Sequence, residues 1–144
     1  SVKLGVSCDH YGEKLAWIRY PINVREFEEN LYTMKDYISN LNVTVSILNV
    51  LDLDEIEKYY KDFKTTFYGI VCKPEILSIR NIPNKEKLIK KYERFPMVVQ
   101  ELHKDTMDGY YKNGIDYCRK LNTKRTIDFN QIFKSSTSSI ADSA

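Results

Sequence analysis

Carboxylates are the side chains whose types and spacing in this chain could do chemistry. Asp9 ends a first apolar stretch, Asp52 follows a later one, and Asp105 and Asp108 lie three residues apart further on. On a helix, a spacing of three places both carboxylates on one face. Carboxylates contributed by separate elements can hold two divalent cations for phosphodiester cleavage. A metal-dependent nuclease is therefore one hypothesis.

The order of these acidic residues is similar to that of nucleases with the ribonuclease H-like fold. Residues 103–109 (HKDTMDG) resemble the late-helix acidic motif of Holliday-junction resolvases in that superfamily. The resemblance implies a metal site formed by Asp9, Asp52, Asp105 and Asp108. Tyr11 stands where the family carries a glycine, and only two strands are clear where the family has three.

The carboxylates also have ordinary structural roles, and these are the roles that we expect. Asp9 should lie in an exposed turn, and Asp52 should accept hydrogen bonds as a helix cap. Asp105 and Asp108 should face solvent on the outside of a helix, beside lysines. On this interpretation the four side chains do not converge, and the nuclease stays an alternative.

Other catalytic motifs are missing from the sequence. It contains no GxxxxGK[ST], GxGxxG or GxSxG segment, and it has only five glycines. The two histidines, His10 and His103, are far apart and form no close pair of metal ligands. We therefore expect no cofactor, no resident metal and no catalysis by the domain itself.

Basic residues gather toward the C-terminal end and raise a nucleic-acid alternative. The whole chain carries a net charge of +2, and its Lys and Arg residues outnumber its acidic ones only after residue 84. Such clusters can contact phosphates, although a helix face of mixed charge is usually only solvated. The residues that would make these contacts are Lys85, Lys87, Lys90, Lys91, Arg94, Arg119, Lys120, Lys124 and Arg125.

Two tyrosine pairs, at 59–60 and 110–111, favour a protein partner. In each pair helical geometry lets only one ring face the core squarely, so the other ring should be partly exposed. Exposed tyrosines are enriched at protein interfaces. The candidate partner-binding residues are Tyr59, Tyr110 and Tyr111, and the alternative is that they simply border the core.

Length, composition and cysteine use indicate one soluble domain. The chain has 144 residues, 42% of them hydrophobic and 29% charged, and no apolar run approaches the roughly 20 residues of a membrane span. Cys8, Cys72 and Cys118 lie far apart, which favours a reducing compartment and core positions. The leading hypothesis is a non-enzymatic protein–protein interaction domain, a scaffold or regulatory module excised from a larger intracellular protein of the cytoplasm or nucleus.

The secondary structure that we expect from the sequence gives an α/β fold. Alternation over 2–8 and the segment 14–20 predict two strands joined as a hairpin. The apolar spacing of Phe27, Leu31, Met34 and Ile38 predicts a helix over 24–40 with all four side chains buried. Asn23 should cap that helix.

The rest of the chain predicts further crossovers and then helices. Strands are expected at 43–51 and 67–72, with a helix between them and a short edge strand at 75–80. Helices are expected at 85–95, 97–121 and 129–133. The fold class is thus α/β, a single mixed sheet with an N-terminal hairpin and βαβ-type crossovers, followed by a helical C-terminal part. We expect one domain over 1–134 and a disordered Ser-rich tail or linker over 135–144.

Overall fold

The computed structural model describes residues 2–134 and 136–137. Over these residues the chain forms three strands and seven α-helices, which confirms the α/β class. The strands are β1 (Leu4–Ser7), β2 (Ile38–Val45) and β3 (Thr65–Ile70). They pair in the order β1-β2-β3, and both pairs are parallel.

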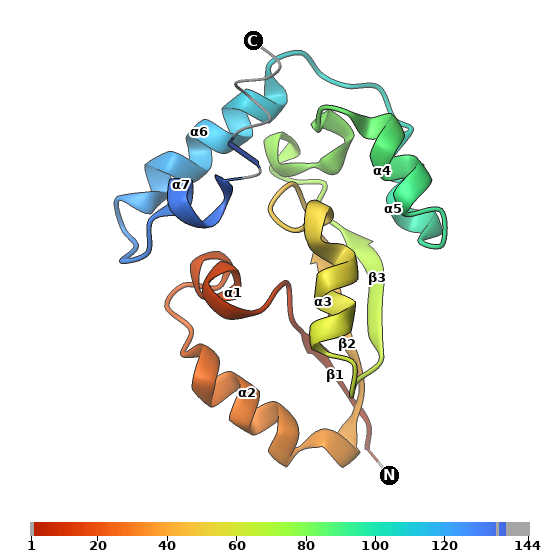
Figure 1. Ribbon diagram of the computed structural model, residues 1–144, viewed down its shortest axis with the longest axis vertical. Coiled ribbons are helices and arrows are strands. Elements are labelled where there is room, and N and C mark those ends of the chain that lie inside the picture. The colour runs from red at the N-terminus through yellow and green to blue at the C-terminus, as the bar shows by residue number, and fades with distance from the viewer. Residues whose placement is uncertain (1, 135, 138–144) are drawn as a thin grey trace.

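Helices make the connections that parallel pairing requires. Between β1 and β2 run α1 (Gly12–Ile18) and α2 (Val24–Thr33), and α3 (Leu53–Tyr59) follows β2. In Figure 1 the three strands lie side by side behind α3. The predicted βαβ crossovers are therefore present.

The predicted N-terminal hairpin is wrong, because residues 14–20 fall in α1 and the turn that follows it. Tyr11, Leu15 and Ile18 recur at spacings of four and three, which is helical spacing. Gly12 begins the helix with a φ of +58°, a left-handed backbone that lets the chain turn sharply out of β1.

The helix predicted over 24–40 is also shorter than expected. Asn23 caps α2 as predicted, since its side chain accepts a hydrogen bond from Glu26 N at 3.1 Å. Leu31 is buried, but Met34 is 43% exposed and Ile38 already belongs to β2. The apolar spacing simply continues past the end of α2 through a 3-10 turn at Lys35–Tyr37 into the strand.

The C-terminal part is helical, in shorter pieces than predicted. It contains α4 (Lys85–Lys91), α5 (Pro96–Leu102), α6 (Tyr110–Asn122) and α7 (Phe129–Ile132). Residues 103–109 separate α5 from α6, so the single helix expected over 97–121 is wrong. The expected edge strand at 75–80 is instead two 3-10 turns, Glu75–Leu77 and Ile79–Asn81. No helix in the described part of the chain is long and apolar enough to cross a membrane.

The sheet has one buried face and one polar face. On β2, Leu41, Val43 and Val45 alternate into the hydrophobic core, as a two-residue period requires. The residues between them, Asn42 and Thr44, point to the opposite face, where Asn42 is exposed. The sheet therefore presents polar side chains of β2 to the solvent.

Two residues of the predicted tail, 136 and 137, belong to the described part of the chain. Ser136 is buried, and its backbone carbonyl accepts a hydrogen bond from the Tyr111 hydroxyl at 2.9 Å. At least this part of the predicted tail therefore packs on α6. Residues 135 and 138–144 of that tail lie outside the described residues.

Candidate functional site at the carboxyl edge of the sheet

The carboxyl ends of parallel strands share one edge of a sheet, where α/β proteins commonly bind ligands. At this edge the chain leaves β1 through Asp9, leaves β2 through Ser46 and Asn49, and leaves β3 through Val71. A cavity of about 350 Å³ opens there. Its lining includes Asp9, Arg19, Thr44, Asn49, Trp17 and Arg125.

Asp9 and Asn49 hold the ends of β1 and β2 together. Asp9 is only 8% exposed, and its carboxylate accepts hydrogen bonds from Arg19 Nε at 2.8 Å and from Thr44 N at 3.2 Å. The Asn49 amide donates to the carbonyls of Asp9 at 3.0 Å and Thr44 at 2.9 Å, and its oxygen accepts from Ser46 N. The expectation that Asp9 lies in an exposed turn is wrong, because this network buries it.

Two guanidinium groups border the same cavity. Arg19 uses its Nε on Asp9, and Arg125 donates from its Nε to the Trp17 carbonyl at 2.9 Å. The Arg125 guanidinium also lies over the Trp17 ring, 4.5 Å from its centroid. Guanidinium N–H groups at a cavity of this kind can pair with a carboxylate or a phosphate.

A second polar cluster surrounds His10, which is 2% exposed. Its Nδ1 accepts a hydrogen bond from Tyr11 N at 2.9 Å, so Nε2 carries the proton and donates to Asp52 Oδ2 at 2.9 Å. Lys14 Nζ donates to the same oxygen at 2.6 Å. Burial raises the pKa of the Asp52 carboxyl, but these hydrogen bonds lower it more, so the net pKa lies below its usual value of 3.8.

This geometry fixes the roles of His10 and Asp52. Both ring nitrogens of the histidine are engaged, so neither is free to act as a base. Asp52 precedes α3 as predicted, but its side chain makes no capping hydrogen bond. It instead ties the start of α3 to the start of α1.

The four aspartates of the nuclease hypothesis do not come together. Asp9 and Asp52 belong to the two networks above, while Asp105 and Asp108 are exposed in the loop at 103–109 rather than on a helix. No group of three or more His, Cys, Asp or Glu side chains within residues 2–134 and 136–137 is arranged to hold a metal ion. The geometry therefore gives the nuclease alternative no support.

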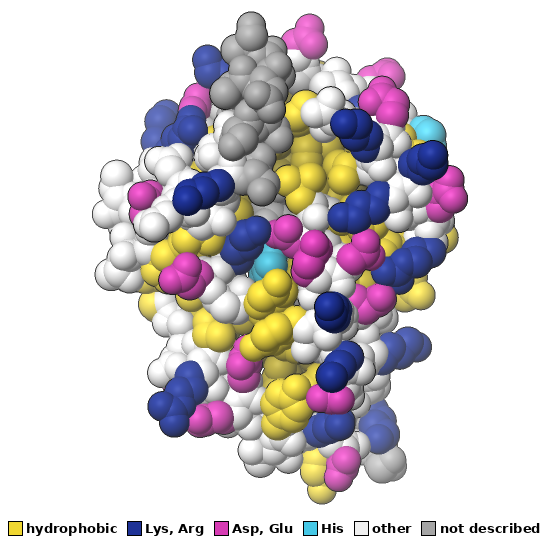
Figure 2. All heavy atoms as spheres, in the orientation of Figure 1, with side chains coloured by type: hydrophobic (Ala, Val, Ile, Leu, Met, Phe, Trp, Pro, Cys, Tyr) yellow, Lys and Arg dark blue, Asp and Glu magenta, His cyan; other side chains and the backbone are white. Residues whose placement is uncertain are grey.

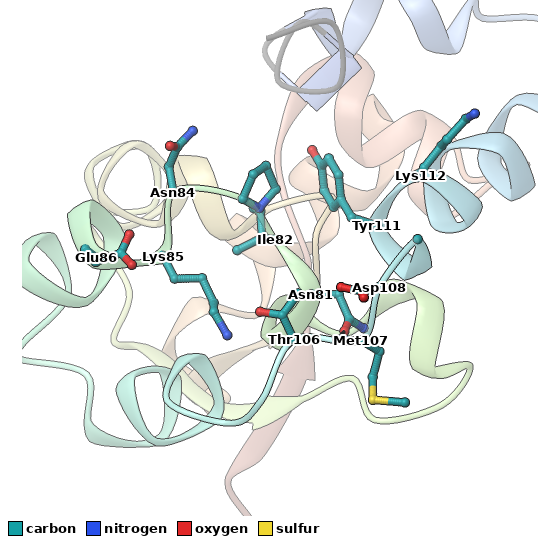
Figure 3. A pocket seen from close by; sticks show the side chains of 12 residues that line it. Asn81, Ile82, Asn84, Lys85, Glu86, Thr106, Met107, Asp108, Tyr111 and Lys112 are labelled. Atoms are coloured by element: carbon teal, nitrogen blue, oxygen red, sulfur yellow. Dashed lines mark hydrogen bonds between the residues drawn. The ribbon is translucent and has the colours of Figure 1, made fainter. Parts of the chain in front are cut away.

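Asp108 lines a different cavity, of about 550 Å³, between the segments 81–86 and 106–112 (Figure 3). Lys85 lies on its opposite wall, and its Nζ donates to the carbonyls of Arg80 at 2.9 Å and Lys104 at 2.7 Å. Burial and the charge of Arg80 lower the pKa of the Lys85 ammonium. Lys85 thus links two loops of the fold.

The basic residues form two separate groups rather than one surface. In Figure 1, α4 and the C-terminal end of α6 lie on opposite sides of the molecule. In the first group Arg94 is paired with Asp54 and Glu57, and in the second Arg119 donates to Asn130. Lys87, Lys90, Lys120 and Lys124 are exposed.

The tyrosine pairs divide as helical geometry predicts. Tyr60 is 1% exposed and Tyr59 is 44% exposed. In the second pair Tyr110 is half-buried, and Tyr111 is buried with its hydroxyl on Ser136. Tyr59 therefore keeps its place as a candidate partner-binding residue, whereas Tyr111 is not accessible to a partner.

All three cysteines are free thiols. Cys8 and Cys118 are buried as predicted, and burial raises their pKa values to about 11 and about 12. Cys72 is exposed just after β3, so its predicted core position is wrong.

Sequence reasoning missed Arg19 and Asn49, which complete the carboxyl-edge network. Asn49 lies inside the segment 43–51 that was predicted to be a strand, whereas β2 ends at Val45, so this assignment hid its role. Arg19 was hidden by the assignment of residues 14–20 to a strand. No family model, curated protein or solved structure matches this chain.

Proposed function

We propose that this chain is a protein–protein interaction domain that docks a partner protein on the polar face of its sheet. The domain performs no chemistry of its own and works inside the cell, a placement favoured by its three free thiols. The uncovered sheet face is the observation that carries the proposal.

The polar face is a continuous surface across all three strands. Asn42 on β2 is exposed, and its side-chain oxygen accepts hydrogen bonds from the Asn40 amide and, at 2.8 Å, from Thr66 Oγ1 on β3. Gly5 on β1 lies beside them, since a Cβ there would stand 3.0 Å from Asn42 Nδ2. Thr44 joins this face to the carboxyl-edge cavity.

A parallel sheet with one open face is unusual. All-parallel sheets occur almost only with both faces covered, because their crossovers place helices over the strands. Here, among the described residues, helices bury one face, and β1 and β3 each pair with a single neighbouring strand. Unpaired edge strands beside an uncovered face are the kind of surface that a partner completes.

The proposal is tested by placing a bulky charge on the polar face. Asn42→Arg should leave the fold intact, because the side chain is exposed, and should abolish co-purification of the partner. Lys120→Glu changes an exposed residue on α6 and serves as the matched control, which should retain the partner. A complex that survives Asn42→Arg would contradict the proposal, and salt-dependent binding of DNA or RNA instead would favour the nucleic-acid alternative.

A further inference from the structure

We propose a second docking surface, independent of the sheet face, that binds a basic segment of a partner protein. It lies between α2 and α3 and is formed by Tyr11, Tyr32, Tyr59 and Phe63, which we name the tyrosine seam. Its aromatic rings are bordered by carboxylates, and this combination fits lysine or arginine side chains.

The rings of the seam contact one another in two pairs. Tyr11 and Tyr59 stack with centroids 4.2 Å apart and an interplanar angle of 9°. Tyr32 and Phe63 meet edge to face at 5.3 Å. Tyr32 and Tyr59 are both exposed, and Figure 2 shows a stripe of hydrophobic side chains running down the molecule between the positions of α2 and α3. The seam thus joins two exposed tyrosines, Tyr32 and Tyr59, each in contact with a half-buried ring.

Carboxylates accompany these rings. The Tyr59 hydroxyl donates to Glu28 at 2.5 Å, which raises the pKa of Tyr59 to about 12. The Tyr32 hydroxyl donates to Asp62 at 3.4 Å. Burial and the charges of Asp52 and Glu55 raise the pKa of Tyr11. Each exposed ring of the seam thus has an acidic neighbour.

Cations also lie near this surface. Lys14 is engaged with Asp52, and Lys58, Lys61 and Lys64 line a groove that they share with Phe63 and Arg94. Lys35 already lies 6.0 Å over the Phe63 ring, so a partner's cation would meet the tyrosine rings of the seam instead.

Three carboxylates bordering the seam are available to a partner. Glu28, Glu55 and Asp62 form no ion pair with any cation in the described part of the chain.

Charge complementarity therefore selects the occupant. A lysine or arginine placed over an exposed tyrosine ring is attracted to the π face, and neighbouring carboxylates add ion pairing. A segment with several basic side chains can engage the stacked pair and the edge-to-face pair together. An acidic or purely apolar segment gains neither interaction.

An acetylated hexaarginine peptide is the probe, with hexaglutamate as its charge control. Binding to the whole chain is followed by NMR shifts of the tyrosine rings and by calorimetry. Hexaarginine should shift the seam rings at low salt and bind more weakly at roughly 0.3 M salt, whereas hexaglutamate should leave the seam rings unshifted.

Variants separate the seam from general attraction of a cationic peptide. Tyr59→Leu should weaken binding about fivefold, and Tyr59→Phe, which keeps the ring, should retain it. Glu28→Gln should weaken binding, while Tyr68→Leu, an exposed tyrosine on β3, should not. The proposal is overturned if hexaarginine shifts no seam ring, or if Tyr59→Leu and Glu28→Gln both bind as the wild type does.

Discussion

Gly114, in the middle of α6, is where helix propensity and packing make opposite predictions. Replacing an interior helical glycine by alanine favours the helix by about 1 kcal/mol. In this fold α6 packs closely on the 3-10 turn at Glu75–Leu77. A Cβ on Gly114 would lie 2.1 Å from the Ile76 carbonyl oxygen and 3.0 Å from Ile47 Cδ1. The obstacle is backbone, which cannot move aside by a rotamer change.

Packing should outweigh propensity for Gly114→Ala. The contact falls roughly 1 Å inside normal van der Waals separation, so the helix or the turn must shift, and overpacking of this kind costs about 1–3 kcal/mol or more. We expect a net loss of about 2 kcal/mol in the free energy of unfolding, which lowers Tm by about 6 °C.

Urea unfolding followed by circular dichroism measures the effect of Gly114→Ala. Asn113→Ala, at the exposed neighbouring position of the same helix, is the control and should be neutral or slightly stabilising. A Gly114→Ala protein as stable as the wild type would refute the packing argument.

Three further predictions concern ionisation, thiol access and the core. Asp52→Asn should destabilise the fold by about 2 kcal/mol at neutral pH, because charged hydrogen bonds from His10 and Lys14 are lost. The pKa of Asp52 is lowered on folding, so its contribution to the free energy of unfolding is complete above pH 3.8 and disappears as the pH falls through the folded pKa. The Asp52→Asn protein should therefore show a flatter acid-unfolding profile than the wild type. An unchanged profile would mean that the hydrogen bonds from His10 and Lys14 do not hold Asp52 in its charged form. Iodoacetamide should modify Cys72 alone in the native protein, and rapid labelling of a second cysteine would contradict the burial of the others. Leu31→Ala should lower the free energy of unfolding by about 2–5 kcal/mol, which a thermal melt would show as a lower Tm. An unshifted Tm would mean that Leu31 does not pack in the core.

Local chemistry was enough to predict part of this fold. The cap at Asn23, the burial of Leu31 and the exposure of Tyr59 beside buried Tyr60 all depend on neighbours within one or two turns of helix. The β-branched stretch around Val43 likewise indicated a buried strand. The α/β class followed from the alternation of such segments.

What the sequence did not reveal depends on distant partners. The apolar spacing in residues 14–20 fits both a strand and a helix. The parallel pairing of β1 with β2, which local sequence does not show, favours the helix. The same error hid the ion pair between Asp9 and Arg19, which needs the turn of α1. Tyr111 became inaccessible through a contact with Ser136, 25 residues away in sequence, which no local pattern contains.

The central claim is that a partner covers the polar face of the sheet, and protection of that face tests it most directly. Asn42→Cys in a Cys72→Ser background places one accessible thiol on the face, and Lys120→Cys in the same background is the control. The account predicts that the thiol at position 42 is alkylated readily in the purified domain and at least about tenfold more slowly in extracts of the cells that express it, a ratio equivalent to about 1.4 kcal/mol of protection. The thiol at position 120 should react equally in both settings. Equal alkylation of position 42 in the purified protein and in the extract would contradict the account.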